Sequence, residues 1–341
     1  MTEAPERLDR FMARAAAAYY GGRDPFGARG DFTTAPEISQ AFGECLGLWA
    51  AVAWQSMGRP APVLLAEAGP GRGTLMADAL RAIGQVMPAF RAALRVHLVE
   101  QSPVLRAAQA QAVEPLLDQD GATWHEDLST LPDGPLLLLG NEFLDALPVR
   151  QFVRRGGAWM ERYVQAGAFV EQPAGDVAGP ALPAAAPDGA VQEVSEAARG
   201  LVAALAARLA AQGGAALFLD YGPAASGFGD SLQALRGHRA ADPLADPGEV
   251  DITAHVDFAA LAAAARAAGA AAHGPVPQGL FLQALGLVTR AAMLARAAPA
   301  TAGHQLSAAQ RLIAPEGMGR LFKALAICHP DLPTPPGFEA A

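Results

Sequence analysis

The chain has 341 residues, of which 52% are hydrophobic and 17% are charged, and its formal net charge is −9. That length suits one large domain or one domain with a substantial insertion. A negative charge argues against a broad basic surface for DNA or RNA, because nucleic-acid binding depends on neutralising phosphates. The two cysteines provide neither a disulfide framework nor a zinc cluster. We therefore expect a protein of a reducing compartment, with the cytoplasm as its location, no nucleic-acid partner and no metal.

The first sixty residues predict helices with one break. The N-terminus has early acidic residues and no long apolar run, which favours a helix start over a signal peptide. Glycine, proline and aspartate then gather in residues 21–31, which predicts a loop. Thr33 or Thr34 is expected to cap a helix that begins at Pro36 and Glu37. The chain has no uninterrupted stretch of about 18 strongly apolar residues, so we expect no membrane insertion.

The segment from Leu64 to Arg81, LLAEAGPGRGTLMADALR, is the most informative part of the sequence. An apolar run containing Glu67 leads into Gly69, Gly71 and Gly73 and then into apolar residues at helical spacing. This order predicts a strand, a tight glycine loop and a helix. Glycines suit such a loop because they adopt backbone angles that a Cβ resists and let a ligand approach the main chain.

The same loop favours S-adenosylmethionine (SAM) over a dinucleotide. The dinucleotide fingerprint requires a glycine where this chain has Thr74. The carboxylate of Glu67, two residues before the first glycine, would also repel a pyrophosphate. SAM carries an ammonium and a sulfonium and no phosphate. A nicotinamide-dependent oxidoreductase remains the less favoured alternative.

Further apolar runs predict the other strands of a parallel, doubly wound sheet. One covers Val96 to Glu100, a second covers Leu136 to Leu139, and a third covers Ala216 to Leu219. Ligands bind such sheets at the carboxyl ends of the strands. The polar residues that follow or close these runs are therefore candidates for the site: Glu67, Glu100, Asp127, Asn141, Glu142, Asp220 and Tyr221. Glu100 is placed to bind ribose hydroxyls and Asp127 to lie beside an adenine.

Two stretches interrupt this pattern. Residues 156–213 are rich in Ala, Gly and Pro and have little periodicity at first, which predicts an insertion or linker. Residues 222–257 form a second irregular segment, long enough to be a lid or binding loop. We accordingly expect a helical N-terminal region over 1–60, a core over 61–155 and 214–330, an insertion over 156–213 and a tail over 331–341.

Several sequence blocks appear in an order that resembles the MidA type of SAM-dependent methyltransferases. The resemblance runs from about Arg14 to Ile327. The blocks are GDFTTAPEISQAFGE, EAGPGRGTL, NEFLDALPVRQF, DYG, SLQALRGHR, DPGEVDITAHVDF and MGRLFKALAI. The mitochondrial members of this family are protein-arginine methyltransferases needed for assembly of respiratory complex I.

The resemblance implies a class I methyltransferase fold, of the Rossmann-like type, with SAM as cofactor. For the mitochondrial members it also implies dimethylation of an arginine on a complex I core subunit, so the partner here would be a protein substrate. By matching motifs, Glu67 and the three glycines form the SAM loop, Glu100 contacts the ribose, and Asn141 and Glu142 face the reacting methyl. The block from Thr34 to Gln40 is expected to close over the cofactor. This chain has Ala35 where relatives often carry serine.

An arginine acceptor places a particular demand on the site. Its guanidinium charge is delocalised and its pKa exceeds about 12, so carboxylates must grip the fork and localise electron density on one nitrogen. Glu142 and Asp145 are the candidates for this pair, and Glu37 is a third. Alternatively, Asn141 and Glu142 cap a following helix. A catalytically silent assembly factor that keeps the fold and binds a partner is a further alternative for the whole chain.

Overall fold

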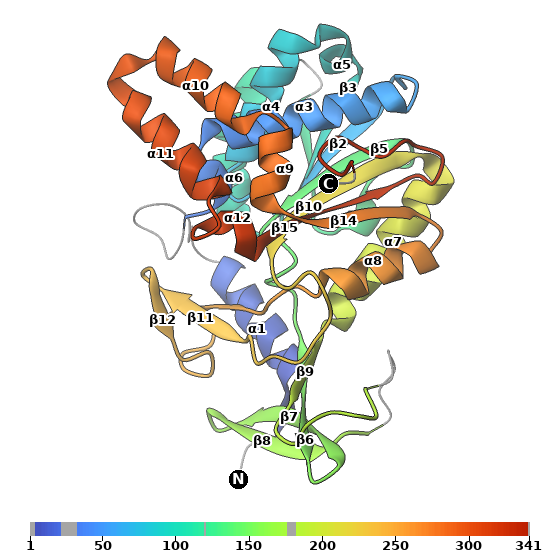
Figure 1. Cartoon of the computed structure of the whole chain (residues 1–341), viewed down its shortest axis with the longest axis vertical. Helices are drawn as coiled ribbons and strands as arrows, with labels where there is room; N and C mark the ends of the chain where they lie inside the picture. The colour runs from blue at the N-terminus through green and yellow to red at the C-terminus, as the bar shows by residue number, and fades with distance from the viewer. Residues whose placement is uncertain (1–3, 22–32, 119–120, 176–181, 340–341) are drawn as a thin grey trace.

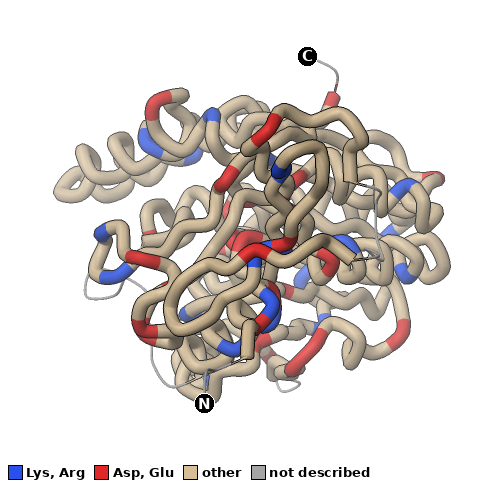
Figure 2. Tube along the Cα trace, turned by 90° about the horizontal axis from the view of Figure 1, so that it is seen from below, with Lys and Arg blue, Asp and Glu red and all other residues tan. Residues whose placement is uncertain are grey.

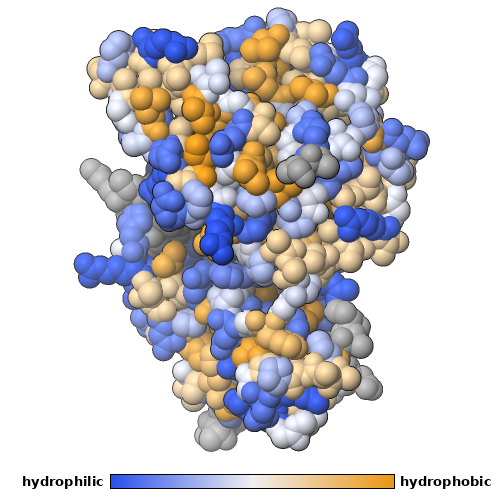
Figure 3. All heavy atoms as spheres, viewed as in Figure 1, coloured by the Kyte–Doolittle hydropathy of each residue, from blue (hydrophilic) through white to orange (hydrophobic). Residues whose placement is uncertain are grey.

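The computed structural model describes residues 4–21, 33–118, 121–175 and 182–339. The loop predicted for residues 21–31 therefore lies outside the described residues from residue 22 on. Figure 1 shows a large sheet flanked by helices in the upper part of the molecule and smaller sheets below it. Figure 3 shows that the lower part is the narrower one and that apolar residues on this face lie in small areas among hydrophilic ones.

The large sheet has seven strands in the order β14-β15-β10-β5-β2-β3-β4. All the pairings from β10 to β4 are parallel, and β15 runs antiparallel to both β10 and β14. This is the predicted doubly wound α/β sheet with one reversed strand. The strands are β2 Val63–Ala68, β3 Leu94–Val99, β4 Ala122–His125, β5 Leu136–Asn141, β10 Gly214–Tyr221, β14 Ala271–Pro277 and β15 Phe322–Cys328.

The central strands are mainly apolar because both faces of the sheet are covered. Leu65 and Leu137 pack into the core on one face, whereas Leu64 and Leu138 pack into the core on the other. The first face is covered by α3 Gln40–Ser56, α4 Thr74–Val86, α5 Pro88–Ala93, α6 Pro103–Val113, α9 Gln278–Ala284, α10 Leu287–Ala297, α11 Ala302–Ile313 and α12 Met318–Leu321. The second is covered by α7 Glu196–Gln212 and α8 Phe258–Ala267. Such alternation is the signature of a fully buried sheet.

The lower part of the molecule consists of two small antiparallel sheets and a helix. One sheet contains β1 Glu6–Arg7, β6 Arg150–Arg155, β7 Ala158–Gln165, β8 Ala168–Pro173 and β9 Val191–Val194. The other contains β11 Gln233–Arg236, β12 Arg239–Ala241 and β13 Asp251–Thr253. Helix α1 Leu8–Gly21 packs between them, and its Leu8 and Phe11 share an apolar core with Val149 and Ile252. This part lies below the carboxyl-terminal edge of the main sheet (Figure 1).

The two stretches expected to be irregular therefore contain regular structure. Within 156–213, strands β7, β8 and β9 belong to the small sheet, while α7 packs on the main one. Within 222–257, three short strands form a sheet of their own. Their period-two pattern is weak because the half-buried strands carry many small or charged residues. The remaining short helices in the described part of the chain are α2 Ala35–Ile38, η1 Glu114–Leu116, η2 Leu128–Thr130 and η3 Pro299–Thr301.

Charges are distributed without a continuous basic face in the view of Figure 2, where Lys and Arg are scattered among Asp and Glu. Among the described residues, no single helix has both the length and the apolar composition to cross a membrane. The pair α9 and α10 meets those two criteria only jointly, with a bend of 65° between them.

Candidate functional site

A cavity of about 1170 Å³ opens at the carboxyl ends of the central strands. Its walls come from the glycine loop after β2, from the ends of β3, β5 and β10, and from α1 and β13 of the lower part. The site therefore lies where a doubly wound sheet binds its ligands. A volume of this size exceeds the usual range of small-molecule pockets, about 300–1,000 Å³, and leaves room for a nucleoside cofactor with an acceptor group beside it.

The glycine loop has the left-handed backbone that its sequence predicts. Gly69, Gly71 and Gly73 have φ angles of +63°, +54° and +83°. Gly69 and Gly71 line the cavity. A Cβ on Gly69 would come within 3.0 Å of the Phe143 ring, so this approach requires glycine. Gly73 does not line the cavity, because it lies against α6, where a Cβ would be 3.2 Å from the backbone of Gln109.

Glu67 lies below the loop and does not line the cavity. Its side chain is 3% exposed and accepts a hydrogen bond from the backbone N–H of Met76, in the first turn of α4. Burial raises the pKa of this carboxyl well above its usual range. Its second oxygen, Oε2, has no partner among the described residues. Glu67, expected to form part of the SAM loop, thus lies at the end of β2 beside the first turn of α4 and is not among the cavity-lining residues.

The cofactor end of the cavity is lined by Glu100, Glu126 and Asp127. The oxygens of Glu100 accept from the Ser102 N–H at 2.8 Å and from Nε2 of Gln109 at 3.2 Å. Gln109 also donates to the carbonyl of Gly71 at 2.8 Å and so joins Glu100 to the glycine loop. Burial raises the pKa of Glu100. Sequence reasoning missed Gln109, because a glutamine on an amphipathic helix gives no signal.

Asp127 lies on the exposed rim of the same end, after β4. It accepts a hydrogen bond of 2.7 Å from the N–H of Ser129, and hydrogen bonding to Ser129 lowers its pKa. The residues present fit SAM: a glycine cradle open to the cavity, a carboxylate at the end of β3 and another after β4. Within the described residues, no group of three or more His, Cys, Asp or Glu side chains is arranged to hold a metal ion.

The short helix α2 Ala35–Ile38 lies beside the cavity, where the N–H of Ala35 donates to Glu142. Thr34 is its N-cap residue, but its side chain makes no capping hydrogen bond and does not line the cavity. Glu37 does not line the cavity either; it accepts a hydrogen bond of 2.5 Å from Oγ1 of Thr74, the first residue of α4. Thr33 is the residue of this block that lines the cavity. This hydrogen bond from Thr74 to Glu37 therefore links α2 to α4, the helix that follows the glycine loop.

The acceptor end of the cavity is built by the turn after β5. Glu142 lines the cavity with a φ of +49°, a conformation that side chains rarely adopt and that tends to occur at functional sites. Its Oε1 accepts from the N–H of Ala35 and from Nδ2 of Asn141, both at 3.1 Å. Asn141 is buried and does not line the cavity. No helix begins after Asn141 and Glu142, so the interpretation of this pair as a helix cap is wrong.

Three carboxylates gather at this end. Burial, reinforced by the charges of Asp145 and Asp251, raises the pKa of Glu142 to about 7. Burial raises the pKa of Asp145 to about 6, and a hydrogen bond from Tyr221 opposes that rise. Asp251, on β13, accepts a 2.8 Å hydrogen bond from the hydroxyl of Tyr20 on α1. All five of these side chains line the cavity. Sequence reasoning did not select Asp251 or Tyr20, because only the packing of the small sheet against α1 brings them to the site.

Asp220 holds the turn in place from behind. Its Oδ2 accepts from the N–H groups of Phe143, Leu144 and Asp145 at 3.1, 2.8 and 3.2 Å. It is 1% exposed and does not line the cavity, whereas the neighbouring Tyr221 does. Burial and the nearby negative charge of Asp145 raise its pKa, and the backbone donors act in the opposite direction. Asp220 is thus a positioning residue for the carboxylates at the acceptor end.

Residues 45–276 match the family model described as "Putative S-adenosyl-L-methionine-dependent methyltransferase". The chain belongs to this methyltransferase family. A Burkholderia thailandensis protein crystallised with S-adenosyl-homocysteine bound has the same fold, with a TM-score of 0.80 and 30% sequence identity over 99% of this chain and 89% of that chain. The fold class predicted from the sequence is confirmed, and so is SAM as the cofactor.

Curated relatives are similar over most of the chain. "Protein arginine methyltransferase NDUFAF7 homolog, mitochondrial" of Drosophila melanogaster is 36% identical, covering 94% of this chain and 80% of the relative. The Mus musculus and Homo sapiens relatives named "Protein arginine methyltransferase NDUFAF7, mitochondrial" are 35% and 34% identical, each covering 94% of this chain and 80% and 79% of their own length. These comparisons place the chain in the family that the sequence blocks resemble.

The same names correct one expectation. The relatives are mitochondrial, which contradicts the cytoplasmic location predicted from the sequence. That prediction rested on the low cysteine count, which indicates a reducing compartment, and on the cytoplasm as the default where no targeting segment was recognised. A low cysteine count suits any reducing compartment, so it carried no information on which one.

Proposed function

We propose that this methyltransferase acts on the guanidinium of a protein arginine. The observation that carries the proposal is the gathering of Glu142, Asp145 and Asp251 in the cavity that the glycine loop opens. A guanidinium is planar, keeps its positive charge and presents donors in a fork that matches carboxylates. An acceptor site lined by three buried or half-buried acids suits such a group far better than a neutral hydroxyl or a thiol. The names of the relatives support the same activity.

When bound, SAM supplies a methyl group on a positively charged sulfur. The residues of the chain then have to hold one guanidinium nitrogen in line with that methyl, and such positioning can lower the barrier by about 7–11 kcal/mol. In our proposal Asp145 and Glu142 grip the fork. Methyl transfer releases one proton from the attacked nitrogen. The Glu142 carboxylate, whose pKa lies at about 7, accepts that proton.

The finer proposal concerns the partner. The sequence blocks shared with the MidA type support a protein substrate and, among proteins, a core subunit of respiratory complex I. Asn141, Glu67, Thr34 and Glu37 do not line the cavity and are proposed to act indirectly. Asn141 donates to the cavity-lining Glu142, while Glu37 and Glu67 accept from the first turn of α4. Gly69, Gly71, Glu100 and Asp127 are proposed to contact SAM itself.

The test compares Glu142→Gln with the unchanged protein on a complex I core subunit preparation. Gln keeps the shape and an acceptor oxygen for the Ala35 N–H but removes the charge. We expect kcat/KM for methylarginine formation, followed by mass spectrometry, to fall about 100-fold. The affinity for S-adenosylhomocysteine, measured by calorimetry, should stay within a factor of about two.

Glu114→Gln is the control, since Glu114 is exposed and does not line the cavity. It should leave both measurements unchanged. If the unchanged protein binds S-adenosylhomocysteine and the subunits but forms no methylarginine, the silent partner-binding alternative holds in place of the proposed activity.

A further inference from the structure

A second cavity, of about 560 Å³, adjoins the acceptor end of the first. The two share His255 and Leu321 as lining residues, so they are separated by the thickness of a side chain. The ring of His255 packs edge-on against Tyr221, with ring centroids 5.7 Å apart. If an arginine of a polypeptide enters the first cavity, the residues next to that arginine would therefore lie at the second cavity.

The walls of the second cavity are mainly apolar. Side chains from the main sheet's connections, from α7 and α8 and from the small sheet contribute to them, including Leu144, Val149, Val194, Ala198, Phe228 and Leu261. Two large apolar side chains at this cavity are open to solvent, Phe228 at 43% and Leu321 at 46% exposure. Exposed apolar surface that continues into a cavity beside an acceptor site is typical of a binding subsite.

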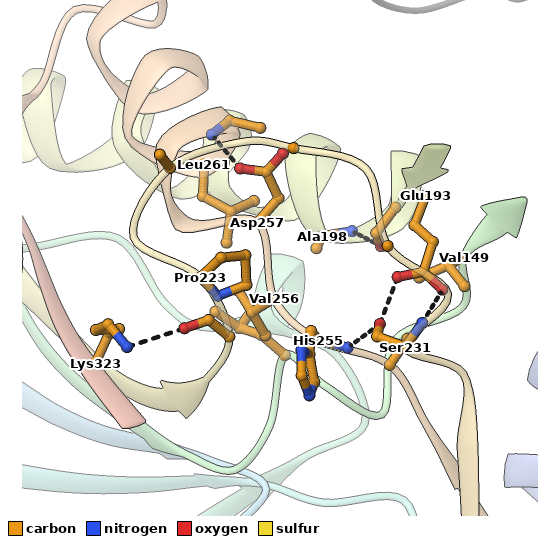
Figure 4. Close-up of a pocket in the computed structure, with 18 of the residues that line it drawn as sticks. Val149, Glu193, Ala198, Pro223, Ser231, His255, Val256, Asp257, Leu261 and Lys323 are labelled. Atoms are coloured by element: carbon orange, nitrogen blue, oxygen red, sulfur yellow. Dashed lines mark hydrogen bonds between the residues drawn. The ribbon is translucent and has the colours of Figure 1, made fainter. Parts of the chain in front are cut away.

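The acids of the second cavity are already occupied. Glu193 accepts from the Ser231 N–H at 3.0 Å and from Gln151 at 2.7 Å, and Ser231 in turn accepts from the N–H of His255 at 2.8 Å. Asp257 caps α8 through the N–H of Ala260 at 2.9 Å. Figure 4 shows the Glu193, Ser231 and His255 chain on one side of the cavity and Asp257 at the start of α8.

The basic residues of the second cavity differ in whether they have hydrogen-bond partners. Lys323 donates to the carbonyls of Gly222, Arg320 and Leu321 at 3.0, 2.6 and 3.0 Å, so its ammonium is satisfied (Figure 4). The guanidinium groups of Arg199 and Arg320 have no hydrogen bond or ion pair with any described residue, and Nε of Arg199 is buried without a partner. The side chains without a partner among the described residues are therefore positively charged in the second cavity, whereas acids predominate among the charged residues that line the first.

We propose that the second cavity binds the part of the substrate polypeptide next to the acceptor arginine, and that it takes an apolar side chain with an acidic residue beside it. The inference rests on the proposed function. The apolar walls would bury the first side chain, and Arg199 and Arg320 would pair with the carboxylate of the second. This arrangement would also disfavour targets in which a second basic residue takes the place of the acidic one, since its charge would repel the two guanidinium groups.

The test measures binding of short arginine peptides to the protein loaded with S-adenosylhomocysteine. The peptides carry Leu-Asp, Leu-Lys or Gly-Ser next to the arginine, on the amino or the carboxyl side. We expect a Leu-Asp peptide of one polarity to bind about tenfold more tightly than the Gly-Ser peptide, because it gains apolar burial and an ion pair. The Leu-Lys peptide should bind less tightly than the Leu-Asp peptide.

Substitutions of lining residues, with one control, test whether the peptide preference arises in the second cavity. Ala260→Phe should fill the cavity and reduce the preference for Leu-Asp to less than twofold, because Ala260 lines it. Ala263→Phe, on the same helix but exposed and away from the cavity, is the matched control and should keep the preference. Arg199→Glu should reverse the order of the Leu-Asp and Leu-Lys peptides.

Equal binding of all peptides, or a preference that survives Ala260→Phe, would overturn the subsite. Methylation of the same peptides, measured in parallel assays that contain SAM, distinguishes a failure of the subsite proposal from a failure of the proposed function. Methylarginine formed without any flank preference leaves the function standing and removes the subsite. Flank preference without methylarginine leaves a peptide-binding site and removes the function.

Discussion

Glu142 combines two costly features at one position. It has a left-handed backbone conformation, which residues other than glycine rarely adopt. Its carboxyl group is buried, which makes ionisation unfavourable. Both features reduce the stability of the fold, and each is typical of residues that act chemically. The neighbouring Asp145 and Asp251 add to the cost, because like charges at short range repel. A guanidinium between these acids would remove most of that repulsion.

The raised pKa of Glu142 predicts how activity depends on pH. The carboxylate form, which grips the guanidinium and accepts the proton, is populated only above a pH of about 7. kcat/KM should therefore rise through that pH and level off above it, after a lower step from Asp145 at about 6. In Glu142→Gln the upper step should be absent from the profile. A profile with the same step near 7 in the variant would assign it to another group.

The folding stability contributed by Glu142 should fall as the pH rises, whereas kcat/KM should rise. The pKa of Glu142 is higher in the folded protein than its ordinary value of 4.5, so the fold binds this proton more tightly than the unfolded chain does. Its contribution to stability is therefore lost as the pH rises from 4.5 through about 7. Glu142→Gln should raise Tm above pH 7 and have little effect at pH 4.5, which calorimetric scans at both values would measure. A Tm change that is the same at both pH values would contradict the shifted pKa.

At the scale of elements, the turn after β5 depends on the end of β10. The Oδ2 of Asp220 is the shared acceptor of three consecutive N–H groups, those of Phe143, Leu144 and Asp145. Asp220→Ala should leave these buried donors without an acceptor and lower the free energy of unfolding by about 3 kcal/mol. Asp220→Asn keeps one acceptor oxygen and should cost less. Urea denaturation measures both.

Asp331→Ala is the control for this comparison, because Asp331 is exposed in the segment after β15. Its effect should stay within about 0.5 kcal/mol. If Asp220→Ala proves as mild as the control, the turn is held by the contacts of its own side chains and Asp220 has no positioning role.

The sequence predicts those elements that have a strong hydrophobic pattern. Strands β2, β3, β5 and β10 are almost entirely buried, so each is rich in apolar residues, and a polar residue lies at or just beyond its carboxyl end. Glu100 and Glu142 follow from that edge, whereas Asp145 was selected because a guanidinium acceptor needs a pair of carboxylates. The small sheets were not predicted, because their strands are half exposed and carry many small or charged residues, even though β6 with β7, β7 with β8 and β11 with β12 pair as local hairpins. Tyr20 and Asp251, 231 residues apart, meet only through the packing of the small sheet against α1.

Over the whole molecule, the cavity has walls from both parts. The glycine loop and the strand ends belong to the main sheet, while Tyr20 and Asp251 come from α1 and β13. A ligand bound between them contacts elements that are far apart in the chain. Binding should therefore stabilise the folded protein as a unit, by mass action, and not only the glycine loop.

This linkage gives a test of the whole site that needs no substrate. S-adenosylhomocysteine at about 100 times its Kd should add about 2.7 kcal/mol and raise Tm by about 5 °C, measured by scanning calorimetry. In Gly71→Val the rise should disappear, because φ at this position is +54° and a branched side chain would occupy the cavity wall. Gly84→Val, at an exposed position of α4 with open space around it, should keep the rise. If Gly71→Val kept it as well, the ligand would have to bind away from the glycine loop, and the cradle assigned to SAM would have to be sought on another wall of the same cavity.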